Sequence, residues 1–286
     1  MERFFEENPR PSEVEAGRRG MLKATQVGDV TEIKMGRSIA DETALYWVAA
    51  YLIGGILIDT GCDFSKKELA DFLKGKQVSL IINTHHHEDH VGGNALLARQ
   101  SGLGAMAHPK AIPLMNRKYD LYPFEVELWG YPEPSTATPI GTAVKEDGVS
   151  LRVIETPGHC RDHISLFEEE RRILFSGDIW VGERPKTARV EEDVHQLISD
   201  LRKFEELRPK IMFASLGKVV SEPQQVIRRT RVYLEETRDE VRRLHSEGKS
   251  SEQILEELFG RESVLAEATQ HQLSTKIFIE SFLRDT

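Results

Sequence analysis

The chain has 286 residues, and this length predicts one main domain together with a smaller one. Its 39% hydrophobic and 30% charged residues are typical of a soluble globular protein, and no apolar run approaches the roughly 20 residues that span a membrane. The formal net charge of -9 argues against a protein that binds long nucleic acid by bulk electrostatics, so nucleic acid is not the favoured partner.

The first residues and the cysteines indicate the compartment. Met1-Glu2-Arg3-Phe4-Phe5-Glu6-Glu7 places acids where a signal peptide would have a basic region followed by an apolar one. Cys62 and Cys160 are too few to form a disulfide framework. A reducing cytoplasm is therefore the expected location.

Strand and helix patterns alternate in the first part of the chain. Residues 1 to 27 are polar and show no clear period, so we expect a leader that packs on the surface or is partly helical. Gly54-Gly55 predicts a hairpin, and Ser65-Lys66-Lys67-Glu68 is a capping box that predicts a helix start. The predicted elements are, in order, strand patterns from 30, a hairpin over 47–58, a helix from 66 to about 75, a strand over 78–83, a helix over 94–101 and a strand over 104–108. This order is typical of an α/β layered fold.

Residues 113 to 145 interrupt the alternation. Five prolines exclude a long regular element, and the segment is rich in aromatic residues. A long structured loop of this kind is typical of a lid, a binding wall or a contact between the two copies of a homodimer. A plain packed excursion is the alternative.

The second half of the chain continues with strands and then becomes helical. Strands are predicted over 149–154, 164–167, 173–175 and, as the last one, 210–215, and a helix is predicted after Asp193. Three further helices are predicted over 223–245, 251–259 and 264–282. Residues 221–286 carry 10 basic and 13 acidic side chains, a balance of -3, whereas a DNA-reading module is normally basic. We therefore expect this segment to pack on the main domain or to cover the substrate.

The densest group of metal-ligating residue types directly follows the strand predicted over 78–83. It consists of His85, His86, His87, Glu88, Asp89 and His90. In extended backbone, side chains two residues apart project to the same side, so His85 and His87 can bind one ion together. Imidazoles and carboxylates suit zinc, iron or manganese better than calcium or magnesium. The sequence therefore predicts one or two Zn2+ ions here, with iron or manganese as alternatives.

The pattern His85-x-His87-x-Asp89-His90 resembles the signature of the metallo-β-lactamase superfamily. Further motifs of that family occur in its order, over about residues 30 to 220: Asp59-Thr60-Gly61 precedes this pattern, and Thr156-Pro157-Gly158-His159 and Ser176-Gly177-Asp178 follow it. The resemblance implies a four-layer αββα sandwich, with a catalytic domain over 1–220 and a helical C-terminal domain over 221–286. The chain looks most like the branch that contains β-lactamase-like protein 2, a group with endoribonuclease activity, and is also similar to glyoxalase II-like hydrolases.

The resemblance also implies a role for each motif residue. His85, His87 and His159 resemble the three-histidine first metal site, Asp89 and His90 resemble ligands of the second site, and Asp178 resembles the carboxylate that bridges both ions. Asp59 is expected to be a buried acid that supports the site, with a plain turn residue as the alternative. Where the family has a last histidine ligand, this chain has Leu216, so water or another residue must complete the second site.

The predicted chemistry follows from the ions. A bound metal lowers the pKa of its water toward about 7, which predicts a hydrolase that uses a metal-activated water on an ester or thioester of a small molecule. Asp89 is expected to orient the nucleophile or to pass on its proton. His163 is expected to support the site or to donate a proton, and a polar residue that opens the next strand is the alternative. The other functions are an endoribonuclease or phosphodiesterase and, because of Leu216, a degenerate metal-binding protein without catalysis.

Overall fold

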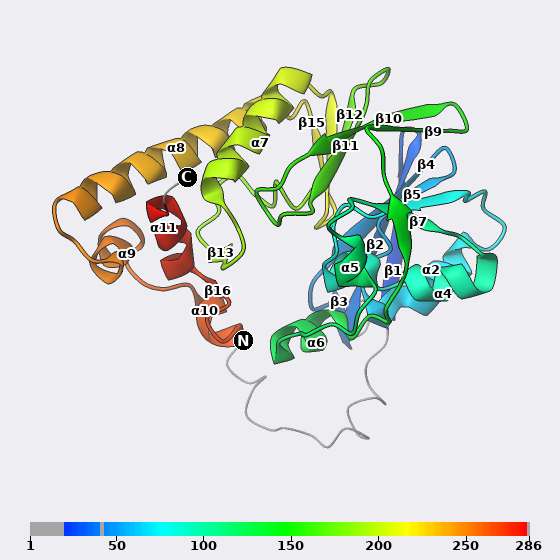
Figure 1. The fold of residues 1–286 in the computed structure, drawn as a ribbon, viewed down its shortest axis with the longest axis horizontal. Coiled ribbons are helices and arrows are strands. Elements are labelled where there is room, and N and C mark those ends of the chain that lie inside the picture. The colour runs from blue at the N-terminus through cyan, green and yellow to red at the C-terminus, as the bar shows by residue number, and fades with distance from the viewer. Residues whose placement is uncertain (1–19, 41–42, 285–286) are drawn as a thin grey trace.

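The computed structural model describes residues 20–40 and 43–284, and Figure 1 shows its longer strands in two stacked sheets. The first sheet has the order β1-β2-β4-β5-β6-β7-β8 with β3 paired to β2, and the second has the order β15-β14-β12-β11-β10-β9. The strands of the first sheet are β1 (Gly20–Val27), β2 (Val30–Ala40), β3 (Thr43–Ala44), β4 (Val48–Ile53), β5 (Ile56–Ile58), β6 (Leu80–Ile82), β7 (Ala105–Ala107) and β8 (Ala137–Pro139). Those of the second are β9 (Ala143–Glu146), β10 (Val149–Glu155), β11 (Ile164–Glu168), β12 (Ile173–Gly177), β14 (Ile211–Ala214) and β15 (Lys218–Ser221).

Three apolar clusters make this a four-layer αββα sandwich, as predicted. Side chains from both sheets meet in the central cluster, for example Ile58 and Phe213. On the outer face of the first sheet, α2 (Lys66–Leu73) and α4 (Asn94–Ser101) pack through residues such as Leu69. On the outer face of the second sheet, α7 (Val194–Leu207), α8 (Gln224–Ser246) and α11 (Thr275–Leu283) pack through residues such as Phe204 and Phe282. Each sheet therefore has one face in the central core and one face under helices (Figure 1).

Two predictions near the N-terminus are wrong. Residues 20–27 were expected in a leader, but they form β1, which pairs antiparallel with β2; residues 1–19 lie outside the described part of the chain. Half of the residues of β1 are exposed and none is buried at this sheet edge, so its sequence carries no alternating apolar pattern. The helix after Ser65 forms as predicted, but Ser65 makes no capping hydrogen bond. Its hydroxyl instead accepts a hydrogen bond from the Gly36 amide (3.2 Å), which ties the helix start to β2.

The proline-rich segment over 113–145 contains no long element, as predicted, but it is packed into the sandwich. It includes most of α5 (Ile112–Met115) together with α6 (Pro123–Trp129), β8 and β9. Tyr119 and Trp129 are buried, whereas Tyr122 is 44% exposed. The roles of a lid and of a homodimer contact stay predictions.

The C-terminal region is helical, as predicted, with α8 followed by α9 (Ser251–Phe259). The predicted third helix is interrupted: α10 (Val264–Ala268) ends before Gln270 and His271, which have positive φ angles of 52° and 62°. The chain then forms β16 (Leu273–Ser274), which pairs with β13 (Ala188–Arg189), before α11 begins. The strand β15 is a further element that the sequence pattern did not predict.

The helices after residue 220 share an apolar cluster with the residues before it. Ile227 and Phe278 belong to the same cluster as Leu174 and Met212 of the second sheet. This cluster extends across the predicted boundary at residue 220. The division into domains over 1–220 and 221–286 stays a prediction. No helix in the described ranges is both long and apolar enough to cross a membrane.

Candidate metal centre

The predicted ligands lie in loops that follow the carboxyl ends of strands. The loop after β6 carries His85 to His90, and its short helix α3 (Glu88–Val91) is held against the Asp59 loop by a hydrogen bond from the Thr60 amide to the His90 carbonyl (2.8 Å). Gly92 is required at this contact, because a Cβ atom there would lie 2.3 Å from the Asp63 amide nitrogen. Loops after β10, β12 and β14 bring His159, Asp178 and Ser215 to the same edge of the sandwich.

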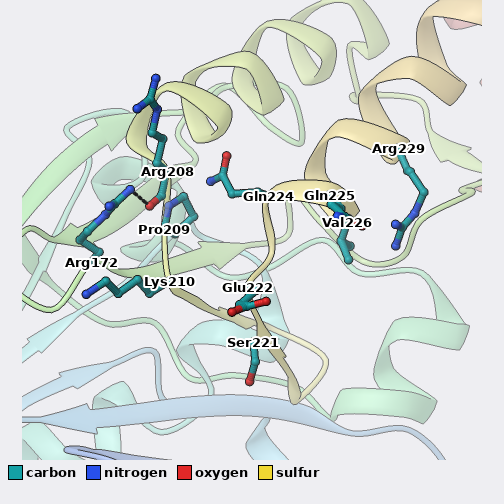
Figure 2. A pocket seen from close by; sticks show the side chains of 10 residues that line it. All are labelled: Arg172, Arg208, Pro209, Lys210, Ser221, Glu222, Gln224, Gln225, Val226 and Arg229. Carbon is teal, nitrogen blue, oxygen red and sulfur yellow. Dashed lines mark hydrogen bonds between the residues drawn. The ribbon is translucent and has the colours of Figure 1, made fainter.

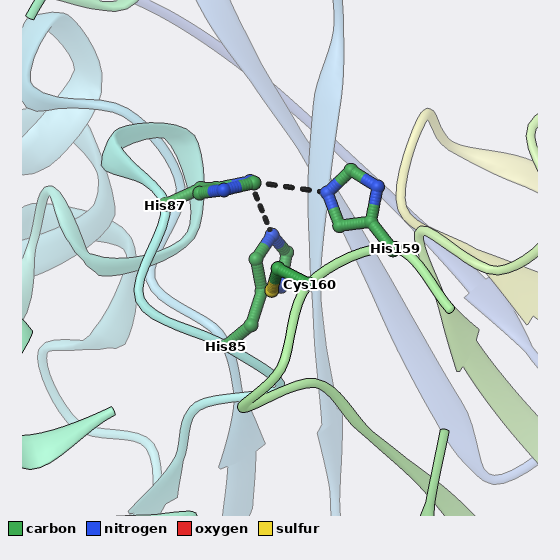
Figure 3. Close-up of side chains that lie close together, drawn as sticks. All are labelled: His85, His87, His159 and Cys160. Carbon is green, nitrogen blue, oxygen red and sulfur yellow. Dashed lines mark hydrogen bonds between the residues drawn. The ribbon is translucent and has the colours of Figure 1, made fainter. Parts of the chain in front are cut away.

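Three imidazole rings converge on one point (Figure 3). His87 Nδ1 lies 2.9 Å from His85 Nε2 and 3.0 Å from His159 Nε2. A tetrahedral ion with Zn–N bonds of about 2.0–2.1 Å would separate two ligand nitrogens by about 3.3 Å, so a small adjustment admits the ion. All three rings are buried. The structure thus brings together the three histidines that the sequence assigned to a first metal site.

A second group adjoins the first. His90 Nε2 lies 3.3 Å from Asp178 Oδ1 and 3.6 Å from Asp89 Oδ2, and the other Asp178 oxygen lies 3.5 Å from His159 Nε2. Asp178 is therefore placed between the two groups. Within the described residues, His90 Nε2 and Asp178 Oδ1 are buried without a hydrogen-bond partner, which is costly unless a cation or a proton satisfies them. This donor set fits a metal ion.

Carboxylates around the imidazole rings bind one nitrogen of each ring, so that the other nitrogen faces the candidate metal position. His90 Nδ1 lies 2.8 Å from Asp59 Oδ2, and His159 Nδ1 lies 2.8 Å from Glu192 Oε1. His87 Nε2 lies 3.0 Å from Glu191 Oε1. Each ring donates its outer N–H to an acid, so its inner nitrogen keeps a lone pair for an ion.

Sequence reasoning identified Asp59 but missed Glu191 and Glu192. Asp59 accepts hydrogen bonds from the Thr84 amide (2.7 Å) and hydroxyl (2.8 Å), so it also fixes the start of the metal loop. The only signal for the two glutamates is the acidic run before the helix α7, a pattern that also occurs at many ordinary helix starts.

His163 is buried beside Asp178 but has both ring nitrogens engaged. Its Nε2 accepts a hydrogen bond from the Asp178 amide (3.0 Å), and its Nδ1 lies 2.8 Å from the Thr156 hydroxyl. Burial, together with the charge of the neighbouring His159, lowers the pKa of His163 to about 3. This geometry supports a positioning role for His163 and disfavours proton donation to a substrate.

Cys160 lies close to the three-histidine group, with its sulfur within 4.8 Å of their ligand nitrogens (Figure 3). Burial raises its thiol pKa well above the usual value, and a buried protonated thiol is a poor nucleophile. Cys160 and Cys62 are both free. The structure thus agrees with an unreactive thiol at this position.

A buried charge cluster joins the metal loop to α6. Arg189 of β13 donates to Glu125 of α6 (2.9 Å), and its guanidinium lies 4.0 Å from Glu88 of the metal loop. Glu88 and Glu125 are buried. Sequence reasoning missed this cluster, because its three members come from distant segments, and Glu125 and Arg189 stand in no recognisable pattern.

A separate basic pocket lies at the ends of β12 and β14 that are opposite to the candidate metal centre (Figure 2). It is lined by Arg172 before β12, by Arg208 and Lys210 before β14, and by Glu222 after β15. The candidate ligands follow the other ends of β12 and β14, so this pocket belongs to a different face of the sandwich.

The fold and the site define a class of protein: a four-layer αββα sandwich with a histidine- and aspartate-lined candidate metal centre at the strand ends. The family model described as Metallo-beta-lactamase superfamily matches residues 48–215, and the chain belongs to this family. Solved structures agree in fold. A metallo-beta-lactamase family protein from Thermus thermophilus has a TM-score of 0.58 at 19% identity, with 92% of this chain and 90% of that chain covered.

Two of the relatives of this chain share a name. The chain is 31% identical to a Beta-lactamase-like protein 2 homolog from Caenorhabditis elegans, over 71% of this chain and 66% of the relative. It is 30% identical to the homolog from Drosophila melanogaster, over 60% of this chain and 59% of the relative. The chain thus spans slightly less than two thirds of the length of these relatives. It is also 36% identical to a Hydroxyacylglutathione hydrolase from Rhodopseudomonas palustris, over 37% of this chain and 35% of the relative.

Proposed function

We propose that this protein is a metal-dependent hydrolase that acts on an ester or thioester of a small molecule. The observation that carries the proposal is the convergence of His85, His87 and His159, whose inner nitrogens lie within 3.0 Å of one another in two of the three pairs. Such a set of buried imidazoles, with Asp178 beside it, is typical of an open catalytic metal site.

The proposed ligands divide into two positions. His85, His87 and His159 would hold the first ion, Asp89 and His90 would contribute to the second, and Asp178 would serve both. When bound, such ions lower the pKa of a coordinated water and stabilise negative charge on a substrate oxygen. Zinc is the proposed metal, with iron or manganese as alternatives, because imidazole and carboxylate ligands suit all three.

The remaining residues of the site would orient the reacting groups. Asp89 is buried at the second group, with its Oδ2 3.6 Å from His90 Nε2, so its carboxylate would be placed to align an attacking water or to accept its proton. His163 would keep Asp178 in place through the amide hydrogen bond of 3.0 Å. Asp59 and Glu192 would keep His90 and His159 in the ligating tautomer.

The substrate class is supported by relatives whose names state a thioester reaction. The chain is 29% identical to Thioesterase pkgB from Emericella nidulans, over 63% of this chain and 48% of the relative. An endoribonuclease or phosphodiesterase is the alternative, and the net charge of -9 disfavours a long polyanionic substrate. We place the protein in the cytoplasm, because its two cysteines are free and buried.

A substrate panel tests the proposal. Purified protein is supplied with zinc, manganese or iron and assayed against acyl thioesters, simple esters, phosphodiesters and short RNA. We expect turnover of a thioester or ester that depends on the added metal. Cleavage of RNA or phosphodiesters alone would replace this function by the alternative, and a metal-bound protein without any turnover would indicate a non-catalytic role.

A further inference from the structure

The second group of the candidate metal centre lacks the histidine that the family pattern has at position 216. Leu216 cannot bind a metal, and it is preceded by Ser215. Among the described residues, three buried polar atoms near this position lack a hydrogen-bond partner: His90 Nε2, Asp178 Oδ1 and Ser215 Oγ. A buried polar atom without a partner is costly, and one cation at this position would satisfy all three.

The strand register places Ser215 beside Asp178. Strands β12 and β14 are parallel, with Gly177 paired to Ala214, so Asp178 and Ser215 are the first residues after the ends of neighbouring strands. The Ser215 carbonyl accepts a hydrogen bond from the Ala49 amide (2.6 Å), which fixes its backbone. Ser215 is 2% exposed, so water from bulk solvent does not reach its hydroxyl freely. The Ser215 hydroxyl faces the Asp178 carboxylate, and among the described residues its oxygen has no hydrogen-bond partner of good geometry.

We infer that the Ser215 hydroxyl is a ligand of the second metal position, together with Asp89, His90 and Asp178. This inference rests on the proposed metal centre. A neutral hydroxyl oxygen can bind a metal without losing its proton, as the serine or threonine of phosphate-binding loops binds magnesium.

The assignment has a consequence for metal choice. The first position offers three imidazoles, which suit zinc. The second would offer one imidazole together with the oxygen atoms of two carboxylates and one hydroxyl. Manganese binds oxygen ligands more readily than imidazole. We therefore expect the two positions to differ in selectivity, with manganese competing more successfully with zinc at the second.

The test compares Ser215→Ala and Ser215→Thr with wild type and with Ser176→Ala. The Ser176 hydroxyl is buried on β12 but already donates to the Gly177 carbonyl (3.2 Å), so this variant controls for loss of a nearby hydroxyl. Metal-free protein is loaded with one equivalent of zinc and titrated with manganese, and free manganese is followed by electron paramagnetic resonance. We expect Ser215→Ala to weaken binding of the second ion by roughly 10- to 100-fold, with zinc at the first position retained.

The two other variants should bind the second ion within about threefold of wild type, because Ser215→Thr keeps the hydroxyl and Ser176→Ala keeps all proposed ligands. A Ser215→Ala protein with the wild-type dissociation constant for the second ion would overturn the assignment. Wild-type protein that binds only one ion of any metal would overturn it as well. Both results are independent of catalysis, so they are distinguishable from failure of the hydrolase proposal, which the substrate panel decides.

A further variant keeps the test valid if Ser215→Ala does not fold. Ser215→Cys places a thiol at the proposed ligand position, and a thiolate bound to cobalt gives a strong near-ultraviolet charge-transfer band. Titration of zinc-loaded Ser215→Cys with cobalt should produce this band, and wild type serves as the control because its Cys62 and Cys160 remain in both proteins. Absence of the band at saturating cobalt would contradict the assignment.

Discussion

His159 takes part in both halves of the candidate centre. Its Nε2 faces His87 at 3.0 Å and Asp178 at 3.5 Å, and its Nδ1 is held by Glu192 at 2.8 Å. Replacement by alanine would leave two histidines at the first position, which are too few for stable binding. We expect His159→Ala to lose the tightly held ion and to reduce turnover by at least about 1,000-fold, as judged by elemental analysis and by rate.

The control for this substitution is His245→Ala, which removes an exposed histidine from the end of α8. This variant should keep wild-type metal content and turnover. Purified His159→Ala with full metal content and turnover would contradict the ligand assignment.

The outer carboxylates allow the two positions to be weakened separately. Asp59 holds His90, and Glu192 holds His159. We expect Asp59→Asn to weaken binding of the second ion and Glu192→Gln to weaken binding of the first, each by about 10- to 100-fold, because the amide no longer fixes the ligating tautomer. Calorimetric titration of metal-free protein measures both constants. Equal effects of the two substitutions on both ions would show that the acids act through general stability.

The sequence predicted those site residues that carry a local pattern. His85, His87 and His90 are neighbours in the chain, so their common role is visible without a structure. Glu192 reaches the site only through loop geometry and stands in no motif, and Ser215 lies beside the motif position of Leu216 but reaches the site through strand pairing. Contacts between distant segments of this kind are set by tertiary packing, which single-sequence periodicity does not encode.

At the scale of elements, α6 is connected to the metal loop through Arg189. The hydrogen bond from Arg189 to Glu125 (2.9 Å) ties α6 to β13, and Glu88 lies on the other side of the guanidinium. Glu125→Gln keeps the shape of this side chain but removes its charge, so the tie weakens. We expect the Michaelis constant to rise by about threefold to tenfold while metal content stays unchanged, since α6 does not supply a proposed ligand.

Steady-state kinetics and elemental analysis of the same preparation check this prediction. Glu127→Gln is the control within the same helix, because Glu127 pairs with Arg37 rather than with Arg189. If Glu125→Gln left the Michaelis constant unchanged, α6 would be a packed excursion without a role in substrate binding.

The mispredicted elements share a physical cause. The Ser65 hydroxyl accepts a hydrogen bond from the Gly36 amide of β2 and does not cap its own helix. The predicted third C-terminal helix is interrupted by β16, which pairs with β13. In the second case the Thr269 hydroxyl accepts a hydrogen bond from the Leu273 amide (3.0 Å), which stabilises the turn between α10 and β16. Local sequence patterns predicted a side-chain cap at Ser65 and an unbroken helix over 264–282, and tertiary contacts overrode both.

At the scale of the whole molecule, the outer helices and the second sheet are stabilised by the same apolar cluster. Phe282 of α11 is fully buried in it and contacts Phe278 at a ring-centroid distance of 4.9 Å. We expect Phe282→Ala to lower the free energy of unfolding by about 3–5 kcal/mol, because a large buried side chain is replaced by a cavity. Val264→Ala, which truncates a side chain that is 63% exposed, should change it by less than about 0.5 kcal/mol.

Urea unfolding followed by circular dichroism measures these free energies and also tests the predicted domain boundary. A single transition that shifts as a whole in Phe282→Ala would indicate that residues 221–286 unfold together with the sandwich. Two transitions, of which only one shifts, would support separate domains over 1–220 and 221–286.

The central claim is that hydrolysis depends on metal bound by the histidines and acids at the strand ends. Stepwise removal of metal with a chelator, with metal content and turnover measured on each sample, tests it most directly. We predict one to two ions per chain at the start, with one removed readily, because the second position has fewer strong ligands than the first. Turnover should fall with metal content, reach background in metal-free protein and return when zinc is added. Full turnover in protein that contains no metal would contradict the account.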